Sequence, residues 1–275
     1  MSLHSNQAHA AQKSHCAATA TSWMLSLPIQ INGMGPYLVS VDTGAGVTVI
    51  LPDVAKELGL EIIATEERRG VGGTISIDMT EACSVTAGGI DVRLDRMGVS
   101  SILKRLGGQS LKGNLGYDVL HHGRLIVDFS GNRIAFERTD STPLLGTPFV
   151  IASTKKPLVT VDAMVNGTGP HRFAVDSGAM GTCMAPRLAA RLGAAKGTPV
   201  QAAGVGGMMD AYFTADPVSL SVGDSCLADV SPVVLDVFDS LAPETGLPLA
   251  GIIGRDIMAQ YVVTIDYPQS IIRFG

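Results

Sequence analysis

The chain has 275 residues and a formal net charge of −5, and 46% of its residues are hydrophobic. This composition supplies apolar material for one large domain or two medium ones, and it argues against the basic surface that nucleic-acid binding requires. No apolar run reaches the roughly 18 residues of a membrane span, so we expect neither nucleic acid nor a membrane as a partner.

Residues 1–26 are polar and rich in alanine, and they lack the apolar core of a secretory signal. We expect them to form a flexible segment, either a leader or what remains after removal of a signal sequence. In the second case the protein would be periplasmic or secreted, and otherwise cytoplasmic. The sequence therefore leaves the compartment undecided.

The first predicted element is a β-hairpin with Asn32-Gly33 as its turn, because Asn-Gly favours the tight turns that join adjacent strands. Its second strand, "YLVSV", is apolar and β-branched and runs directly into Asp42, Thr43 and Gly44. An ionised carboxylate beside a buried strand is costly unless it is paired or hydrogen-bonded. Asp42 therefore requires a partner from elsewhere in the chain.

A short helix is predicted next, over residues 52–60 ("PDVAKELGL"), with Pro near its start and Gly at its end. A glycine-rich hairpin with Gly70–Gly73 at its tip follows, and several strands come after it. Another short helix opens after Gly116, and a strand pair over residues 125–136 closes this half of the chain. The half is thus mostly β, with little helix.

The second half of the chain repeats this plan. "VDSGAMGTCM" aligns with "VDTGAGVTVI", which places Asp176 opposite Asp42 at an offset of 134 (176 − 42). The same offset aligns the two "GVGG" segments, Gly70–Gly73 and Gly204–Gly207. The chain therefore carries two copies of one sequence plan.

The offset grows to 138 (254 − 116) at Gly116 and Gly254, which we attribute to one insertion of four residues. Copies of roughly 125 residues are longer than solenoid repeats, which run about 20–50 residues, so a duplicated domain is predicted. We expect a flexible segment over 1–26, a first lobe over 27–145 and a second lobe over 146–275.

Two copies of one loop imply a pseudo-twofold axis, with Asp42 and Asp176 meeting across it. Two adjacent carboxyls cannot both ionise cheaply, so they share one proton and titrate in separated steps. Such a pair can hold a water: the ionised member accepts its proton while the protonated member donates to a carbonyl oxygen. We therefore predict that Asp42 and Asp176 form a catalytic dyad that hydrolyses peptide bonds.

The neighbours of the dyad are predicted to support it. Thr43 and Ser177 supply hydroxyls that would lock the two loops together, and Gly44 and Gly178 permit close backbone approach. The two glycine-rich tips are predicted to be mobile flaps that fold over an extended peptide. The predicted flap residues are Gly70, Val71, Gly72, Gly73, Gly204, Val205, Gly206 and Gly207.

Four other aspartates also recur in both copies. Asp128 and Asp266 precede turns between strands, and Asp118 and Asp256 lie in the short helices, so structural capping is predicted for all four.

The residue types that often bind metals give no such pattern here. His121 and His122 are adjacent, and the second copy has Ala259 and Gln260 in their place, so we predict that they are surface residues. The cysteines fit no zinc spacing, and we expect buried or idle thiols, with a disulfide left open. They are Cys16, Cys83, Cys183 and Cys226. No metal or organic cofactor is predicted.

In these residues the chain resembles the aspartic peptidases. The Asp-Thr-Gly-Ala and Asp-Ser-Gly-Ala loops, the glycine-rich hairpins and "IIGRDIM" are most similar to the retropepsin-like branch, in which a homodimer contributes one such loop per chain. The resemblance covers nearly everything after Leu27. It implies a mostly β acid-protease fold, with two pseudo-twofold-related β-barrel lobes and few short helices. A monomer would then suffice for activity, with oligomers left open.

The chain departs from that family pattern at one place. Retropepsins usually carry Asp directly after Asp-Thr-Gly-Ala, where it pairs with the arginine of the Gly-Arg segment. Here Gly46 and Met180 stand at that place, and only Arg255, not Tyr117, keeps the arginine. The subsites of the cleft therefore stay undefined by the resemblance.

Two alternatives to an aspartic endopeptidase remain open. The first is a peptide-binding protein that keeps the fold without turnover, whose dyad need not retain a shared proton. The second is a carboxylate metal site. In both protease and binding protein, the expected partner is a peptide or protein.

Overall fold

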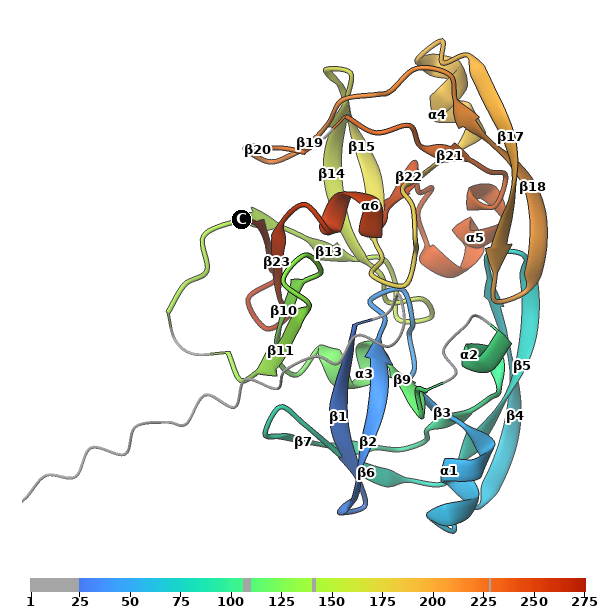
Figure 1. The fold of residues 1–275 in the computed structure, drawn as a ribbon, viewed down its shortest axis with the longest axis vertical. Coiled ribbons are helices and arrows are strands. Elements are labelled where there is room, and N and C mark those ends of the chain that lie inside the picture. Colours follow the sequence, from blue (N-terminus) through green and yellow to red (C-terminus); the bar gives the residue numbers. More distant parts are fainter. Residues whose placement is uncertain (1–24, 106–109, 140–141, 228) are drawn as a thin grey trace, which may run out of the picture.

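The computed structural model describes residues 25–105, 110–139, 142–227 and 229–275. The expected flexible segment lies outside this part of the chain except for its last two residues, and so does Cys16. The described residues form two lobes of curved β-sheet, and a third sheet joins strands from both halves of the chain (Figure 1). The mostly β, two-lobed fold that the sequence implied is confirmed.

The first half of the chain builds a nine-stranded sheet and three short helices. The strands are β1 (Ser26–Ile31), β2 (Met34–Val41), β3 (Val49–Ile50), β4 (Ile62–Gly70), β5 (Gly73–Thr80), β6 (Cys83–Ala87), β7 (Ile90–Leu94), β8 (Gly98–Val99) and β9 (Gly113–Leu115). The helices are α1 (Pro52–Glu57), α2 (Ile102–Arg105) and α3 (Tyr117–Leu120). The strand order is β4-β5-β8-β3-β9-β2-β1-β6-β7.

The second half builds a ten-stranded sheet and three more helices. The strands are β13 (Val150–Ile151), β14 (Val159–Val165), β15 (Thr168–Val175), β16 (Cys183–Met184), β17 (Lys196–Gly204), β18 (Gly207–Thr214), β19 (Leu220–Val222), β20 (Ser225–Cys226), β21 (Val233–Val234) and β22 (Gly251–Ile253). The helices are α4 (Pro186–Arg191), α5 (Phe238–Thr245) and α6 (Arg255–Met258). The order is β17-β18-β21-β16-β22-β15-β14-β19-β20, with β13 beside β14. Apart from β13, it repeats the first sheet strand for strand.

None of the helices formed by the described residues has the length and apolar character needed to span a bilayer. The three described cysteines, Cys83, Cys183 and Cys226, are free thiols.

The predicted Asn-Gly turns open both lobes. Asn32 and Gly33 have φ of 49° and 76°, and Asn166 and Gly167 have φ of 48° and 70°. Two successive residues with positive φ make the tight turn whose twist matches antiparallel strands, and Asn and Gly tolerate that conformation best. Each turn thereby sets the register of the strand that runs into an Asp-Thr/Ser-Gly loop.

The predicted single insertion of four residues is divided in two in the structure. Equivalent positions are 134 apart at Cys183 and Val49, and 135 apart at Val234 and Val99 (234 − 99). The offset reaches 138 at β9 and β22 and stays there to the end of the chain. One extra residue therefore lies in the turn between β18 and β19. The other three lie between β21 and β22, in the segment that contains α5.

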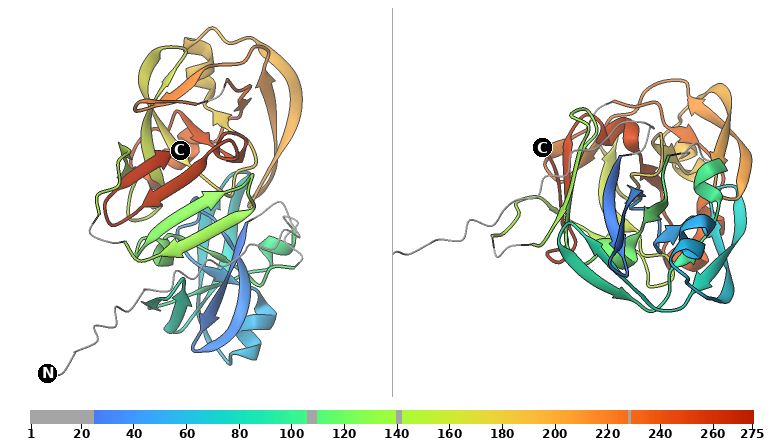
Figure 2. Two further views of the ribbon diagram at one scale, coloured as in Figure 1. Left: turned by 60° about the vertical axis from the view of Figure 1, so that its left-hand side comes forward. Right: turned by 60° about the horizontal axis from the view of Figure 1, so that its bottom comes forward.

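A five-stranded antiparallel sheet connects the two halves. It consists of β10 (Arg124–Asp128), β11 (Arg133–Glu137), β12 (Thr147–Pro148), β23 (Val262–Asp266) and β24 (Ile271–Phe274), in the order β11-β10-β23-β24-β12. Ile126 of β10 faces Thr264 of β23. These two residues are equivalents in the two copies, so the pseudo-twofold axis passes between them. Figure 2 shows the sheet in its left view, with green strands from the first half beside red strands from the second.

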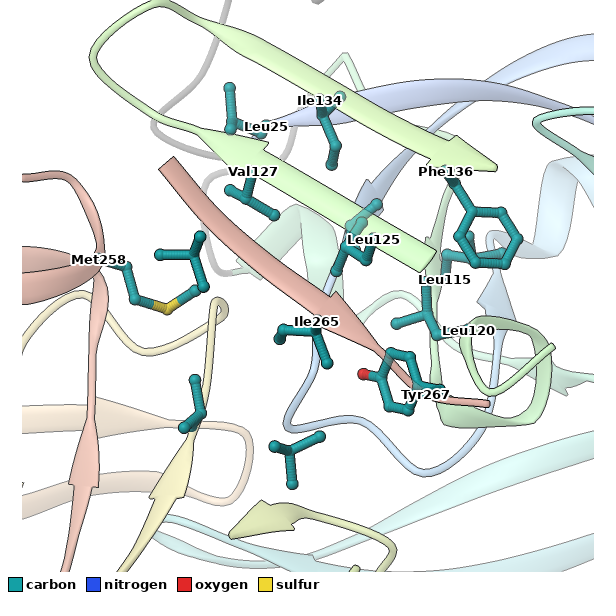
Figure 3. Close-up of a cluster of buried hydrophobic side chains, with 14 of the residues drawn as sticks. Leu25, Leu115, Leu120, Leu125, Val127, Ile134, Phe136, Met258, Ile265 and Tyr267 are labelled. Carbon is teal, nitrogen blue, oxygen red and sulfur yellow. The ribbon is translucent and has the colours of Figure 1, made fainter. Parts of the chain in front are cut away.

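The apolar core is continuous across this sheet. Leu125 and Val127 of β10 and Ile265 of β23 pack with Leu115 and Leu120 from the first lobe (Figure 3). Each of these side chains is no more than 1% exposed. The two halves therefore share one core, and the lobe boundary at 145/146 stays a prediction.

Two recurrent aspartates stabilise the ends of the central strands, as predicted. Asp128 accepts hydrogen bonds from the Gly131 N–H (2.7 Å) and from Arg133 (2.6 Å). Asp266 is fully buried and accepts hydrogen bonds from the Gln269 N–H (3.1 Å) and from Arg124 Nε (2.8 Å). The second ion pair ties β23 of one half to β10 of the other.

We predict that Arg124→Met lowers the free energy of unfolding by roughly 3 kcal/mol, because it leaves the buried Asp266 carboxylate without its cation. Lys112→Met is the control: both side chains of the Lys112–Asp53 pair are exposed, at 44% and 50%, so we expect a loss of at most about 1 kcal/mol. Urea unfolding at neutral pH measures both variants. Equal losses would contradict the role given to the buried pair.

Candidate active site

Parallel strand pairing brings the two aspartate loops to the centre of the molecule. Strand β2 pairs parallel with β9, and β15 pairs parallel with β22. The Asp42 N–H donates to the Leu115 carbonyl (3.1 Å), and the Asp176 N–H donates to the Ile253 carbonyl (3.0 Å). Each aspartate therefore follows directly on a buried strand, and the last backbone bond of that strand pair fixes its position.

The two carboxyls face each other across the axis. Oδ1 of Asp42 accepts a hydrogen bond from the Gly44 N–H, and Oδ1 of Asp176 accepts one from the Gly178 N–H, both at 2.8 Å. A Cβ atom on Gly178 would lie 2.7 Å from Cγ of Asp42, and one on Gly44 would collide with the Asp176 carboxyl. Glycine is therefore required at both places for each loop to approach the opposite carboxyl.

Thr43 and Ser177 take part in four hydrogen bonds between the two loops, two with each other and two with the opposite backbone carbonyls. The Thr43 hydroxyl donates to the Val175 carbonyl (2.8 Å) and accepts from the Ser177 N–H (3.0 Å). The Ser177 hydroxyl donates to the Val41 carbonyl (3.0 Å) and accepts from the Thr43 N–H (3.1 Å). Both residues are buried. The two loops are thus locked together in the twofold arrangement that the sequence suggested.

Both carboxyls are harder to ionise than an ordinary aspartate. Burial raises the pKa of Asp42, and the charge of Asp176 raises it further. Burial also raises the pKa of Asp176, although its hydrogen bond from Gly178 opposes the shift. Because the two groups interact so strongly, the shared proton belongs to the pair rather than to either residue. The pair keeps this proton well above the pH at which a free aspartate loses it.

The surroundings of the dyad are not symmetric. Asn114 Nδ2 donates to Oδ2 of Asp42 (3.4 Å), and Ser40 Oγ donates to Oδ1 of Asn114 (2.9 Å). The equivalent positions in the second copy are Ile252 and Ala174, which offer no such side-chain groups. Sequence reasoning missed this pair. The signal was present, because Asn114 replaces an apolar residue in an otherwise matching motif.

The aspartates of the short helices support the loops from below, as predicted. The Thr48 hydroxyl donates to Asp118 (2.6 Å) and accepts from the Gly116 N–H (3.1 Å). In the second lobe, the Thr182 hydroxyl donates to Asp256 (2.7 Å). These bonds connect the chain after each aspartate loop to the helix beside it.

The positions that depart from the retropepsin pattern do not form its aspartate–arginine pair. Met180 is 67% exposed. The Arg255 guanidinium lies over the Phe129 ring at 5.0 Å, and Tyr117 stacks on the His121 ring at 4.9 Å. His121 is half-buried in this stack and His122 is exposed, so both side chains have access to solvent. Among the described residues, no group of three or more His, Cys, Asp or Glu side chains is placed to hold a metal.

The two glycine-rich tips contact each other. They are the turns of the β4–β5 and β17–β18 hairpins, which meet at the right of Figure 1. The Gly206 N–H donates to the Val71 carbonyl (3.0 Å). A Cβ on Gly70 would collide with the Val205 side chain, and one on Gly72 would collide with the Gly207 backbone. The tips thus pack backbone to backbone, and a role in covering substrate stays a prediction.

Comparison with known proteins gives one family. The model of the aspartyl protease family matches the chain twice, over residues 27–119 and 161–257. No curated protein matches the sequence. Among solved structures, an aspartic proteinase from Irpex lacteus matches with a TM-score of 0.52 and 14% identity, over 91% of this chain and 93% of that chain. At this identity the likeness is one of fold.

We predict that Gly206→Ala separates the two tips, because its Cβ would collide with the Gly73 backbone. Hydrogen–deuterium exchange over residues 70–73 and 204–207 should become faster by about an order of magnitude, as for loss of a few backbone contacts. Gly181→Ala is the control, since its Cβ would meet nothing nearer than 3.9 Å. Unchanged exchange in Gly206→Ala would show that the tips do not pack this way in solution.

We predict that Asp176→Asn stabilises the fold at alkaline pH. The pKa values of Asp42 and Asp176 are raised, so the native pair binds more protons than the unfolded chain, and its contribution to stability falls as pH rises above about 4. The asparagine keeps an acceptor for Gly178 and removes the repulsion. We expect a gain of roughly 1–3 kcal/mol at pH 8 and almost none at pH 3.5.

Urea unfolding at both pH values measures this gain. Asp95→Asn, at an exposed position, is the control and should change neither value. An equal gain in the free energy of unfolding at both pH values would show that the carboxyl pair does not cause it.

Proposed function

We propose that this chain, which belongs to the aspartyl protease family, is an aspartic endopeptidase acting in a cleft between its two lobes. The observation that carries the proposal is the pairing of Asp42 and Asp176 across the pseudo-twofold axis, with Thr43 and Ser177 locking the loops beneath them. Hydrolysis of a peptide bond needs a base and an acid on opposite sides of one water, and this pair supplies both.

The pair would work as one acid–base unit. With one proton between them, one carboxylate accepts a proton from a bound water, and the other carboxyl donates its proton to the oxygen of the substrate carbonyl. The attack of the water then forms a tetrahedral intermediate, and the proton taken from the water passes to the leaving amine. The Gly44 and Gly178 N–H groups hold one oxygen of each carboxyl. The other oxygens, of which Oδ2 of Asp42 also accepts from Asn114, would contact the water and the substrate.

An extended peptide fits this arrangement better than a compact ligand. The hairpin tips at Gly70–Gly73 and Gly204–Gly207 contact each other, and separation of the tips would admit a chain that runs between them and the dyad. Backbone groups of an extended chain can then pair with backbone groups of the hairpins, as strands do in a sheet. The expected substrate is therefore an unstructured segment of a protein or a peptide.

We predict that Asp42→Asn and Asp176→Asn each lower kcat/KM by about 10³-fold or more, because each removes one half of the acid–base unit. Cleavage of an unfolded protein, followed by the appearance of new amino termini, measures the loss. Asp95→Asn should cleave at the wild-type rate. Wild-type turnover in either dyad variant rejects the assignment, and peptide binding without cleavage by the unmodified chain favours the non-catalytic alternative.

We predict a bell-shaped dependence of kcat/KM on pH. Activity falls at low pH, where the second carboxyl also becomes protonated, and at high pH, where the shared proton is lost. Since the pKa values of both aspartates are raised, we expect the alkaline limb to lie well above the pKa of about 3.9 of an ordinary aspartate. A profile that falls steadily from pH 4 upward would contradict a proton held by the pair.

A further inference from the structure

Lys156 lies between the first flap and the dyad. It belongs to the connector that runs from β13 to β14, and its Nζ donates to the Arg69 carbonyl (2.8 Å), one residue before the tip glycine Gly70. The next residue, Pro157, lies 3.0 Å from where a Cβ on Gly46 would be, which places it against the first aspartate loop. The connector therefore holds a cation close to the tip of the first hairpin, beside the candidate active site.

The ammonium of Lys156 is half-buried and has few partners. The Arg69 carbonyl is its one hydrogen-bond acceptor among the described residues, and no described carboxylate lies within ion-pair distance of it. Burial lowers the pKa of Lys156, and the charges of Glu244, Asp176 and Asp42 oppose that effect. A partly desolvated ammonium with two unused N–H groups is costly, and an anion that reached it would offset the cost.

A second cation lies beside Lys156. Arg68 faces the inner side of the first hairpin, its charge acts on Lys156, and its Nε is buried without a hydrogen-bond partner. The other end of the guanidinium pairs with Glu66 (2.5 Å). Two neighbouring cations with unused donors are what a carboxylate binds best.

We propose that Lys156, assisted by Arg68, is a specificity-determining residue that binds an acidic side chain of the substrate near the scissile bond. This inference rests on the proposed function and deepens it, because it names a substrate class: peptides with Asp or Glu close to the cleavage point. The substrate carboxylate accepts hydrogen bonds from two N–H groups of the ammonium, while the third N–H keeps its bond to the Arg69 carbonyl.

Repulsion does not cancel this attraction. The dyad carries one negative charge when it holds its shared proton, and Glu244 faces the ammonium from α5 beyond ion-pair distance. In the proposed complex the substrate carboxylate lies at hydrogen-bond distance from Lys156, whereas Glu244 and the dyad act from farther away. Glu66 pairs with Arg68 (2.5 Å) and offsets part of the guanidinium charge, so Lys156 supplies most of the attraction. The net electrostatic interaction with the substrate carboxylate is therefore attractive, because Coulomb energy falls with distance.

The test compares matched peptides on the full chain. The parent is a neutral peptide found to be cleaved in a digest of an unfolded protein, and Glu or Gln is placed at each of the three positions on either side of the cleavage point. We expect kcat/KM to favour Glu over Gln by about tenfold at one position, the effect of one charge-assisted bond pair. The preference should disappear below about pH 4, where glutamate becomes protonated.

Three variants assign the preference to its cause. Lys156→Met should remove it, Lys156→Arg should retain it, and Lys155→Met, at an exposed neighbouring position, should leave it unchanged. The readout is the ratio of Glu to Gln peptides, so a general loss of flap order in Lys156→Met does not alter it. Absence of a preference in the unmodified chain, or its survival in Lys156→Met, overturns the inference.

A binding measurement separates this inference from the proposed function. Fluorescence anisotropy with labelled Glu and Gln peptides reports the same ratio without turnover. If no peptide is cleaved but the Glu peptide binds more tightly through Lys156, the endopeptidase proposal fails and the acidic preference stands. If both peptides are cleaved and bound equally well, the acidic preference fails and the endopeptidase proposal stands.

Discussion

The exchange of hydrogen bonds between Thr43 and Ser177 is the interaction on which the rest of the structure depends. Each hydroxyl reaches across the pseudo-twofold axis to the carbonyl that precedes the opposite aspartate. Buried hydroxyls need partners, and here each finds its acceptor in the other copy. The loops are therefore fixed relative to each other, and the two carboxyls meet although desolvation and mutual repulsion both disfavour their ionisation.

Two other contacts between the copies lie on the same pseudo-twofold axis. At the base, β10 and β23 pair so that Ile126 faces its own equivalent, Thr264. At the opposite end, the hairpin tips meet through the Gly206 N–H and the Val71 carbonyl. The aspartates thus lie between a rigid shared sheet and a contact of glycine backbones. The site is thus bounded by backbone contacts at both ends of the axis.

The sequence predicted the features that come from repetition and from turn chemistry. Asn-Gly turns, the Pro-started helices and the two aspartate loops each have a local signal, and duplication turned a weak three-residue motif into a paired site. It did not predict the features that come from contacts between distant segments. No sequence pattern singled out Lys156, and the fold places its ammonium against the Arg69 carbonyl of the first hairpin. Asn114 is adjacent to Asp42 only because β2 and β9 pair in parallel.

The departures from symmetry have a consequence for how a polypeptide would lie in the cleft. A perfectly twofold-symmetric binding site offers the same contacts to a peptide that runs in either direction, so it cannot distinguish the two directions of the chain. Here Asn114 and Lys156 break this symmetry, and Ile252 stands at the position equivalent to Asn114. Fusing the two copies into one chain allowed each half to change separately. If the proposed function holds, a peptide bound between the lobes would meet different groups on the amino-terminal and carboxy-terminal sides of its scissile bond.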